Sequence, residues 1–202
     1  MLLKIHPKDP QERLIKTVAE VLSSGGIIIY PTDTIYGLGC DIFQNKAIAQ
    51  VCRIKEIDPK KAQLSFVCAD LSNLSDYAKQ IPNTTFRVLK EHLPGPYTFI
   101  LPASKQVPKI LQSKKDTIGL RVPDNKIVMA IIKSLGHPIL SASLPGEFVE
   151  DYTDPELIYE KYKNLVSLVI DGGIGGTVPS TIVDCTTPEM NVIRHGAGEW
   201  NS

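Results

Sequence analysis

The sequence has few of the residues that build disulfide frameworks or metal sites. Its four cysteines and four histidines are scattered through 202 residues, with no C-x-x-C pair and no cluster of ligands. Zinc sites and disulfide-rich folds place their cysteines and histidines at short, regular spacings. The sequence therefore predicts reduced cysteines, no metal site and no disulfide framework.

Excess charge and long apolar runs are missing as well. Lysine plus arginine equals aspartate plus glutamate at 22 each, so the formal net charge is zero and no global field attracts nucleic acid or a membrane. No apolar run approaches the roughly 20 residues of a membrane span, and the N-terminus shows no signal-peptide pattern. We therefore expect a cytoplasmic protein without a membrane partner, in which any anion site depends on local charge.

What the sequence does contain is an irregular alternation of short helices and strands in one domain, residues 1–202. Helices are expected at residues 9–24, 45–55, 70–78, 82–93, 125–135 and 154–162, and strands at 26–29, 64–68, 97–101, 117–122, 138–142, 166–170, 181–184 and 191–194. Several strands follow one another too closely for crossover helices, which favours a mixed-sheet α/β (α+β) fold. The tail after Gly198 is expected to be loose.

Residues 30–41, YPTDTIYGLGCD, follow the first expected strand and are dense in hydrogen-bonding groups. Thr32, Thr34 and Tyr36 supply hydroxyls, Asp33 supplies a carboxylate, and two glycines would let the backbone approach a ligand. Loops carried by a rigid strand often hold binding residues. Physical reasoning leaves two interpretations open for this stretch, a binding loop and an ordinary polar turn.

Further candidate anion-binding groups lie at the ends of later strands. Arg121 and Arg194 each end a strand, and guanidinium groups suit carboxylates and phosphates. Residues 171–181, DGGIGGTVPST, form a glycine-rich loop whose backbone N–H groups could face one anion, with Ser180 and Thr181 adding hydroxyls. Each feature also has an ordinary structural explanation, a surface ion pair or a flexible connection.

Ser141 and Ser143 add hydroxyls near another strand end, and Lys55, with Lys60 and Lys61 nearby, makes a basic helix end. Ser143 has no G-x-S-x-G elbow, so a triad hydrolase is not indicated. The usual role of a basic helix end is to complement the helix dipole. Taken together, however, these hydroxyls, cations and glycines are what a nucleotide and a small acid would require.

Six segments occur in the order found in one known family. They are PTDTIYGLG (31–39), PGPYTFIL (94–101), GLRVP (119–123), PILSAS (138–143), STIVD (180–184) and RHG (194–196). Over residues 10–198 the chain resembles the YrdC/TsaC family of threonylcarbamoyl-AMP synthases. The resemblance implies a twisted mixed sheet, flanked by helices and curled around a large, concave, positively charged cavity.

The resemblance also implies a reaction and its partners. ATP, L-threonine and bicarbonate would give L-threonylcarbamoyladenylate and pyrophosphate, and the product would serve threonylcarbamoyladenosine modification of tRNA. ATP would enter with Mg²⁺, which offsets the triphosphate charge. Affinity for double-stranded RNA or tRNA is a further trait that the resemblance implies.

Roles for individual residues follow from the resemblance, motif by motif. It places Lys55 and Ser143 in the catalytic set. It implies that Thr32 and Tyr36 line the threonine side, that Arg121 faces the threonine carboxylate or a phosphate, that Ser141 lies by the nucleotide, that Ser180 and Thr181 contact the acid or a phosphate, and that Arg194 contacts a phosphate.

The sequence departs from the family pattern at two places. The family's Lys-x-Arg pair reads Lys55-Glu-Ile57, and its Ser-x-Asn motif reads Ser143-Leu-Pro145. Losing one positioned transition-state donor commonly costs about 10²–10³ in rate. These departures resemble the YciO branch of the family, and they predict weak or altered synthase activity.

Three functional hypotheses follow from the sequence. The first is a nucleotide-binding enzyme of the threonylcarbamoyl-adenylate type with weak or altered activity. The second is a double-stranded RNA-binding protein without catalysis, whose affinity would fall steeply with salt. The third, hydrolysis or transfer on a related adenylate or carbamoyl compound, ranks last because no general base is evident.

Overall fold

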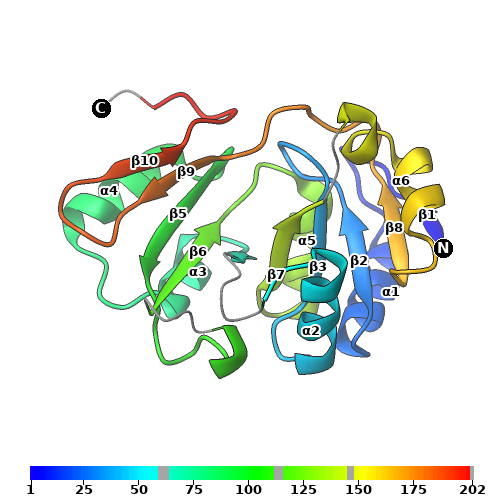
Figure 1. Cartoon of the computed structure of the whole chain (residues 1–202), viewed down its shortest axis with the longest axis horizontal. Helices are drawn as coiled ribbons and strands as arrows, with labels where there is room; N and C mark the ends of the chain where they lie inside the picture. Colours follow the sequence, from blue (N-terminus) through cyan, green and yellow to red (C-terminus); the bar gives the residue numbers. More distant parts are fainter. Residues whose placement is uncertain (59–63, 112–115, 145–147, 201–202) are drawn as a thin grey trace.

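The structure is a computed structural model that describes residues 1–58, 64–111, 116–144 and 148–200. Lys60, Lys61 and Pro145, which entered the sequence analysis, lie outside the described residues. Within the described ranges, one mixed sheet of ten strands carries the fold (Figure 1).

The strands of this sheet follow an order far from that of the sequence. They are β1 (Leu2–Lys4), β2 (Ile27–Tyr30), β3 (Gly37–Asp41), β4 (Ser65–Val67), β5 (Tyr97–Pro102), β6 (Thr117–Arg121), β7 (Ile139–Ser143), β8 (Leu168–Asp171), β9 (Thr181–Asp184) and β10 (Asn191–Arg194). Their spatial order is β1-β8-β2-β3-β7-β4-β6-β5-β9-β10. Parallel and antiparallel pairs alternate irregularly along it, which confirms the predicted mixed α/β sheet.

Six α-helices flank the sheet in the described part of the chain. They are α1 (Glu12–Ser23), α2 (Asn45–Ile54), α3 (Leu71–Tyr77), α4 (Asn83–His92), α5 (Lys126–Leu135) and α6 (Pro155–Tyr162), with 3₁₀ turns at Lys109–Leu111 and Val149–Tyr152. Asp70, Asn125 and Asp154 cap three of them by accepting backbone N–H groups of the first turn. None of the helices described is long and apolar enough to cross a membrane.

The first helix does not start where the sequence predicted. α1 begins at Glu12, after Gln11, and not at Asp9 and Pro10. The Asp9 N–H donates to His6 Nδ1 at 3.0 Å, and Gln11 Oε1 accepts the His6 N–H at 3.2 Å. These two bonds close a turn that precedes the helix.

Two strands come from segments for which no strand was predicted, β1 and β3. β1 pairs with β8 at the edge of the sheet. β3 takes up the second half of the stretch expected to be a loop, and it pairs antiparallel with β2. Gly39 fits there because it has no side chain: a Cβ would lie 2.7 Å from Tyr30 Cε1 and 2.8 Å from Leu140 O. Both glycines of this stretch are therefore strand residues next to the Tyr30 ring, although Gly37 also lines the cavity described below.

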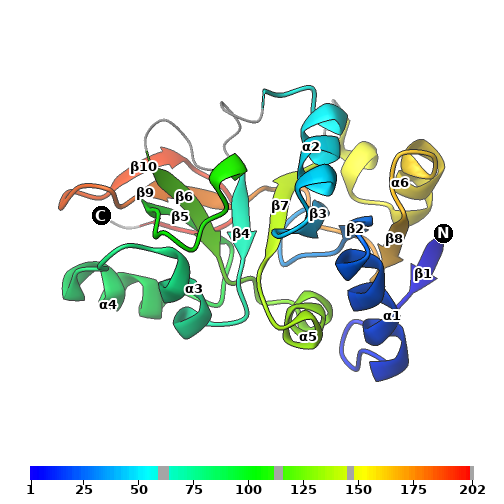
Figure 2. The ribbon, with the colours of Figure 1, turned by 90° about the horizontal axis from the view of Figure 1, so that it is seen from below.

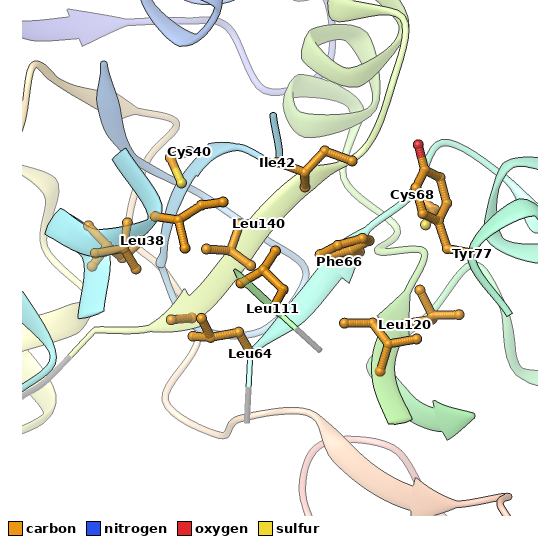
Figure 3. Packing of buried hydrophobic residues seen from close by; sticks show 14 of the residues in the cluster. Leu38, Cys40, Ile42, Leu64, Phe66, Cys68, Tyr77, Leu111, Leu120 and Leu140 are labelled. Carbon is orange, nitrogen blue, oxygen red and sulfur yellow. The ribbon is translucent and has the colours of Figure 1, made fainter. Parts of the chain in front are cut away.

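The two faces of the sheet differ in what covers them. One face buries a large apolar cluster against α2, α3, α4 and α6. In the register of the sheet, Cys40, Leu140, Phe66 and Leu120 follow one another across four strands of this face (Figure 3). Part of the opposite face packs against α1 and α5, which Figure 2 shows on the other side of β2 from α2. Among the described residues, no helix packs against the rest of that face, which carries both polar and apolar side chains.

We predict that Gly39→Ala lowers the free energy of unfolding by about 1–3 kcal/mol, the usual cost of overpacking a core. The new methyl group would press on the Tyr30 ring and on a backbone carbonyl that cannot move independently. Urea denaturation would measure the loss. Gly119→Ala is the matched control on another strand, because the nearest atoms to its Cβ, in Ser65 and Thr98, lie 3.1 and 3.3 Å away. Equal losses in both variants would contradict the packing argument.

Candidate active site

The uncovered part of the sheet forms the floor of a cavity of about 680 Å³. Its walls come from the loop after β2 and from strands on both halves of the sheet. Of the nine residues predicted for the site, seven line this cavity: Thr32, Tyr36, Arg121, Ser141, Ser143, Ser180 and Arg194. Segments up to 160 residues apart in the chain thus meet in one hollow, as the motif order implied.

The floor is the reverse side of the apolar row described above, and it mixes polar and apolar residues. Strand side chains alternate between faces, so the neighbours of the core row point into the cavity. In register across β7, β4, β6, β5 and β9 these are Ser141, Ser65, Gly119, Ile100 and Asp184. The same five strands therefore supply the core on one face and the binding surface on the other.

Arg121 is held at the cavity wall by the loop that follows β2. Its guanidinium Nη2 donates to Asp33 Oδ1 and, at 2.6 Å, to Thr34 Oγ1. The other carboxylate oxygen, Asp33 Oδ2, accepts the Asp124 N–H at 3.1 Å. Arg121 is only 7% exposed, and its Nε has no hydrogen-bond partner among the described residues. A buried donor without a partner is costly, so this N–H is suited to a ligand oxygen.

Arg194 approaches the same cavity from β10. Its Nε and Nη2 donate to Ser180 O at 3.1 and 2.7 Å, and the Ser180 hydroxyl is hydrogen-bonded to Thr98 Oγ1 at 2.9 Å. Partial burial, and then the positive charge of Arg121, lower the pKa of Arg194. Two guanidinium groups close enough to repel each other are suited to hold an anion between them.

Lys55 and Ser143 meet at the mouth of the cavity. Lys55 Nζ donates to Ser143 O at 2.6 Å and lies 3.2 Å from Ser143 Oγ. Lys55 does not itself line the cavity, but this contact brings its ammonium group to the wall. Desolvation lowers the pKa of Lys55. The structure therefore brings together the two residues assigned to catalysis.

Two tyrosines with buried hydroxyls fix the neighbouring segments. Tyr30 OH donates to Ser141 Oγ at 2.7 Å, and burial raises the pKa of Tyr30 to about 12. Tyr36 OH donates to Gly173 O at 2.7 Å and accepts the Gly172 N–H at 3.1 Å, and burial raises the pKa of Tyr36 to about 12 as well. Both phenols stay neutral near pH 7 and act as fixed hydrogen-bonding groups.

Comparison with known proteins assigns this arrangement to one family. The family model Sua5_yciO_yrdC, described as telomere recombination, matches residues 20–196. The YciO protein of Escherichia coli strain K12 is 45% identical over 199 residues, which are 96% of this chain and 95% of that protein. The chain belongs to the Sua5/YciO/YrdC family. This confirms the resemblance to its YciO branch.

Solved structures and a synthase of the Sua5/YciO/YrdC family agree with this assignment. The crystal structure of E. coli YciO has a TM-score of 0.92 at 42% identity and covers 98% of this chain and 97% of its own. Sua5 of P. abyssi complexed with L-threonine has a TM-score of 0.88 at 27% identity, covering 97% of this chain and 57% of that chain. Threonylcarbamoyl-AMP synthase of Coxiella burnetii is 28% identical over 90% of this chain and 98% of its own length.

Thr181 is the predicted contact that the structure places away from the cavity. Ser180, directly before β9, and Ile182 and Asp184 of β9 line the cavity, whereas Thr181 is fully buried and does not. Its Oγ1 donates to Gly198 O at 2.6 Å and accepts the Gly196 N–H at 2.9 Å. The alternation of side chains along the strand therefore gives Thr181 a structural task on the opposite face.

The glycine-rich loop after β8 does not form the anion nest that the sequence suggested. In this Sua5/YciO/YrdC chain its N–H groups are used inside the protein: Gly172 donates to Tyr36, Gly173 to Asp171, Gly175 to Thr153 and Gly176 to Thr34. The loop lies on the loop after β2 so tightly that a Cβ on Gly176 would be 2.4 Å from Thr34 O. The glycines thus allow two loops to pack, and that expectation was wrong.

Ile57 occupies the position that corresponds to the arginine of the family's Lys-x-Arg pair. Its side chain is partly buried and packs against the main apolar cluster, and it does not line the cavity. An arginine at this position would lose the apolar contacts that Ile57 makes with the cluster. Residue 57 thus supplies apolar packing after α2 and no charge.

Sequence reasoning also missed lining residues. Ser65, Thr98 and Asp184 line the cavity, and Asp33 anchors Arg121 from behind the wall. The available signal was strand alternation: Thr98 and Ser65 lie two residues from apolar or glycine positions on the same face. The sequence does not show which face of the sheet forms the cavity, so alternation alone could not identify these residues as lining residues.

We predict that Asp33→Ala lowers the free energy of unfolding by about 3–5 kcal/mol, because it leaves a buried guanidinium without its counter-ion. Both side chains of the pair are about one-tenth exposed. Thermal or urea unfolding would measure the loss. Adding Arg121→Met to Asp33→Ala is expected to restore part of the stability by removing the unpaired charge.

The matched control for this prediction is Glu12→Ala, which breaks the fully exposed pair between Glu12 and Lys16. It is expected to leave the unfolding midpoint unchanged, because exposed ion pairs contribute little. A similar loss in Glu12→Ala and Asp33→Ala would argue against a special role for the buried pair.

Proposed function

We propose that this chain is an L-threonylcarbamoyladenylate synthase-like enzyme with weak or altered activity. Threonine and bicarbonate would combine to a carbamate with release of water. A carbamate oxygen would then attack the α-phosphorus of ATP, and the bond to the β-phosphate would break with release of pyrophosphate. The observation that carries the proposal is the convergence of Arg121, Arg194 and Lys55 on one hydroxyl-lined cavity.

The amino-acid end of the cavity is proposed to be the wall around Arg121. A substrate carboxylate would satisfy the unpartnered Nε and face the hydroxyls of Thr32 and Thr34. Asp33 and Thr34 already fix the guanidinium, so little side-chain entropy is lost on binding. P. abyssi Sua5 was solved with L-threonine, and its fold matches 97% of this chain, which supports an amino acid as ligand.

The phosphate end is proposed to lie between Arg194 and Lys55. A triphosphate would relieve the repulsion between the guanidiniums of Arg121 and Arg194. Mg²⁺ would be held mainly by the phosphates, since the described residues contain no group of three or more His, Cys, Asp or Glu that could hold a metal ion. When bound, it would neutralise charge on the triphosphate.

The nucleobase is proposed to occupy the outer part of the cavity. Ile100, Ile182 and Ile193 line it with apolar surface suited to an aromatic ring. Asp184 closes this part, with Oδ1 accepting from Thr186 N and Oγ1 at 2.9 and 2.7 Å. From Arg121 to Asp184 is two strands and two residues of register, about 12 Å, so the proposed carboxylate and base ends of the cavity are well separated. Phosphate near Asp184 would be repelled, which sets the orientation.

Pyrophosphate release from ATP, L-threonine, bicarbonate and Mg²⁺ tests the proposal. We expect slow turnover above background, and a further loss of about 10²–10³ in Arg194→Ala because one positioned donor is removed. Arg87→Ala, on the exposed side of α4, is the control and is expected to keep wild-type turnover. Absence of any adenylate product, with no calorimetric binding of ATP or threonine, would overturn the proposal. Salt-sensitive binding of double-stranded RNA would then favour the RNA-binding alternative.

For the nucleobase, we predict that AMP binds at least about tenfold more tightly than IMP, because the Asp184 carboxylate accepts from an amino group and repels a carbonyl. Asp184→Asn keeps an oxygen for Thr186 and is expected to remove most of this preference. Calorimetry with both nucleotides would measure it. If 2′-deoxy-AMP loses as much affinity as IMP, or if wild type does not discriminate, the assignment of Asp184 to the base is wrong.

A further inference from the structure

The C-terminal segment up to Trp200 is attached to the back of the cavity. We call His195–Trp200 the C-terminal strap. It follows Arg194 directly and runs from the cavity face to the opposite face, where Thr181 Oγ1 donates to Gly198 O at 2.6 Å and accepts the Gly196 N–H at 2.9 Å. The Ala197 N–H donates to Pro179 O at 2.8 Å. The loose tail expected after Gly198 is contradicted at Glu199 and Trp200, which contact Tyr97 and His92, and residues 201 and 202 lie outside the described residues.

The C-terminal strap fits its groove closely. A Cβ on Gly196 would lie 2.2 Å from Pro179 O, and a Cβ on Gly198 would lie 2.4 Å from the Tyr97 ring. Tyr97 OH donates to Glu199 O at 2.8 Å. The backbone of the strap therefore lies too close to Pro179 and Tyr97 to leave room for a side chain at Gly196 or Gly198.

Trp200 anchors the end of the strap. Its ring lies 4.9 Å from the His92 ring at an interplanar angle of 32°, and 6.2 and 6.4 Å from the rings of Phe99 and Tyr97. Aromatic contacts of this kind add about 0.5–1.5 kcal/mol each beyond the area they bury. Phe99 belongs to the core row of the sheet, so the strap is joined to the most rigid part of the fold.

Arg194 lies between this anchored strap and the sheet. On the cavity side, Ser180 O accepts a hydrogen bond from the Arg194 guanidinium. On the far side, Thr181, the residue after Ser180, binds the segment that follows Arg194. The pairing of β10 with β9 shifts register between Val192 and Arg194, so the ladder alone does not fix the arginine. The repulsion from Arg121 would move an unanchored Arg194 away from the cavity.

We propose that Thr181 and Trp200 are positioning residues, which hold Arg194 where it meets a ligand phosphate without touching the ligand themselves. This inference rests on the proposed function for the nature of the ligand. Positioning matters because Arg194 is exposed and rich in rotamers, so ordering it on binding would cost free energy that the strap removes in advance.

The test compares AMP with adenosine, which differ only in the phosphate. In Thr181→Val, calorimetry is expected to give about tenfold weaker AMP binding and unchanged adenosine binding, because only the phosphate contact depends on Arg194. Thr181→Ser keeps the hydroxyl and is expected to restore AMP affinity. Thr187→Val, which removes an exposed hydroxyl from the β9–β10 loop, is the matched control and is expected to bind both ligands normally.

A second variant keeps the test decisive if Thr181→Val does not fold. Trp200→Leu removes the aromatic anchor at the surface and is expected to cause the same loss for AMP alone, with Trp200→Phe close to wild type. Trp200 is the only tryptophan in the chain, so its emission reports on the strap. Neither AMP nor adenosine is expected to change this emission in the wild-type protein, because the strap is in place before binding.

Each other outcome overturns a defined part of the argument. Equal loss of AMP and adenosine binding, or no loss, would make the strap purely structural and overturn the inference while leaving the proposed function intact. A Thr181→Ser variant as weak as Thr181→Val would overturn the hydrogen-bond mechanism. Wild-type protein that binds neither AMP nor adenosine would overturn the proposed function and this inference with it.

Discussion

The buried ion pair between Asp33 and Arg121 is the interaction on which the cavity depends. It joins the loop after β2 to β6, which lies four strands further along the sheet, and Asp33 also accepts an N–H from the residues that lead into α5. Because an unpaired charge in this setting costs several kcal/mol, the loop has little freedom to leave. Its position then fixes the glycine-rich loop, whose N–H groups bond to Thr34 and Tyr36. One charge pair thus shapes two of the cavity walls.

The sequence predicted the larger features of this fold well, for identifiable reasons. β9 and β10 have the predicted bounds because turn-forming segments flank each of them, and three helices start within a residue of the predicted positions, directly after a polar residue that caps them. β3 was missed because two glycines and polar neighbours resemble a loop, and their strand role depends on the distant Tyr30 ring. Local composition cannot reveal a requirement imposed by a residue on another strand.

Only part of the candidate site, like only part of the fold, could be predicted from the sequence. Motifs identified the seven lining residues, because the resemblance places them without knowledge of their neighbours. The motifs could not say that Thr181 faces away, since a strand of alternating residues gives two equivalent choices of phase. The glycine-rich loop misled for a similar reason, because free and occupied N–H groups look identical in a sequence. In both cases the sequence does not show which groups of the folded protein the Thr181 hydroxyl and the glycine N–H groups contact.

The strand order has a consequence for how the chain reaches its folded state. β2, complete by Tyr30, lies between β3 and β8, so one of its edges has no partner until residues 168–171 exist. Contacts that span 140 residues close slowly, and at about 5–20 residues per second the ribosome needs roughly ten seconds or more to supply that partner. During that interval the emerging chain carries an apolar, unpaired strand edge. Chaperone binding and aggregation compete with folding while it is exposed, and translation speed through residues 31–168 sets how long they have.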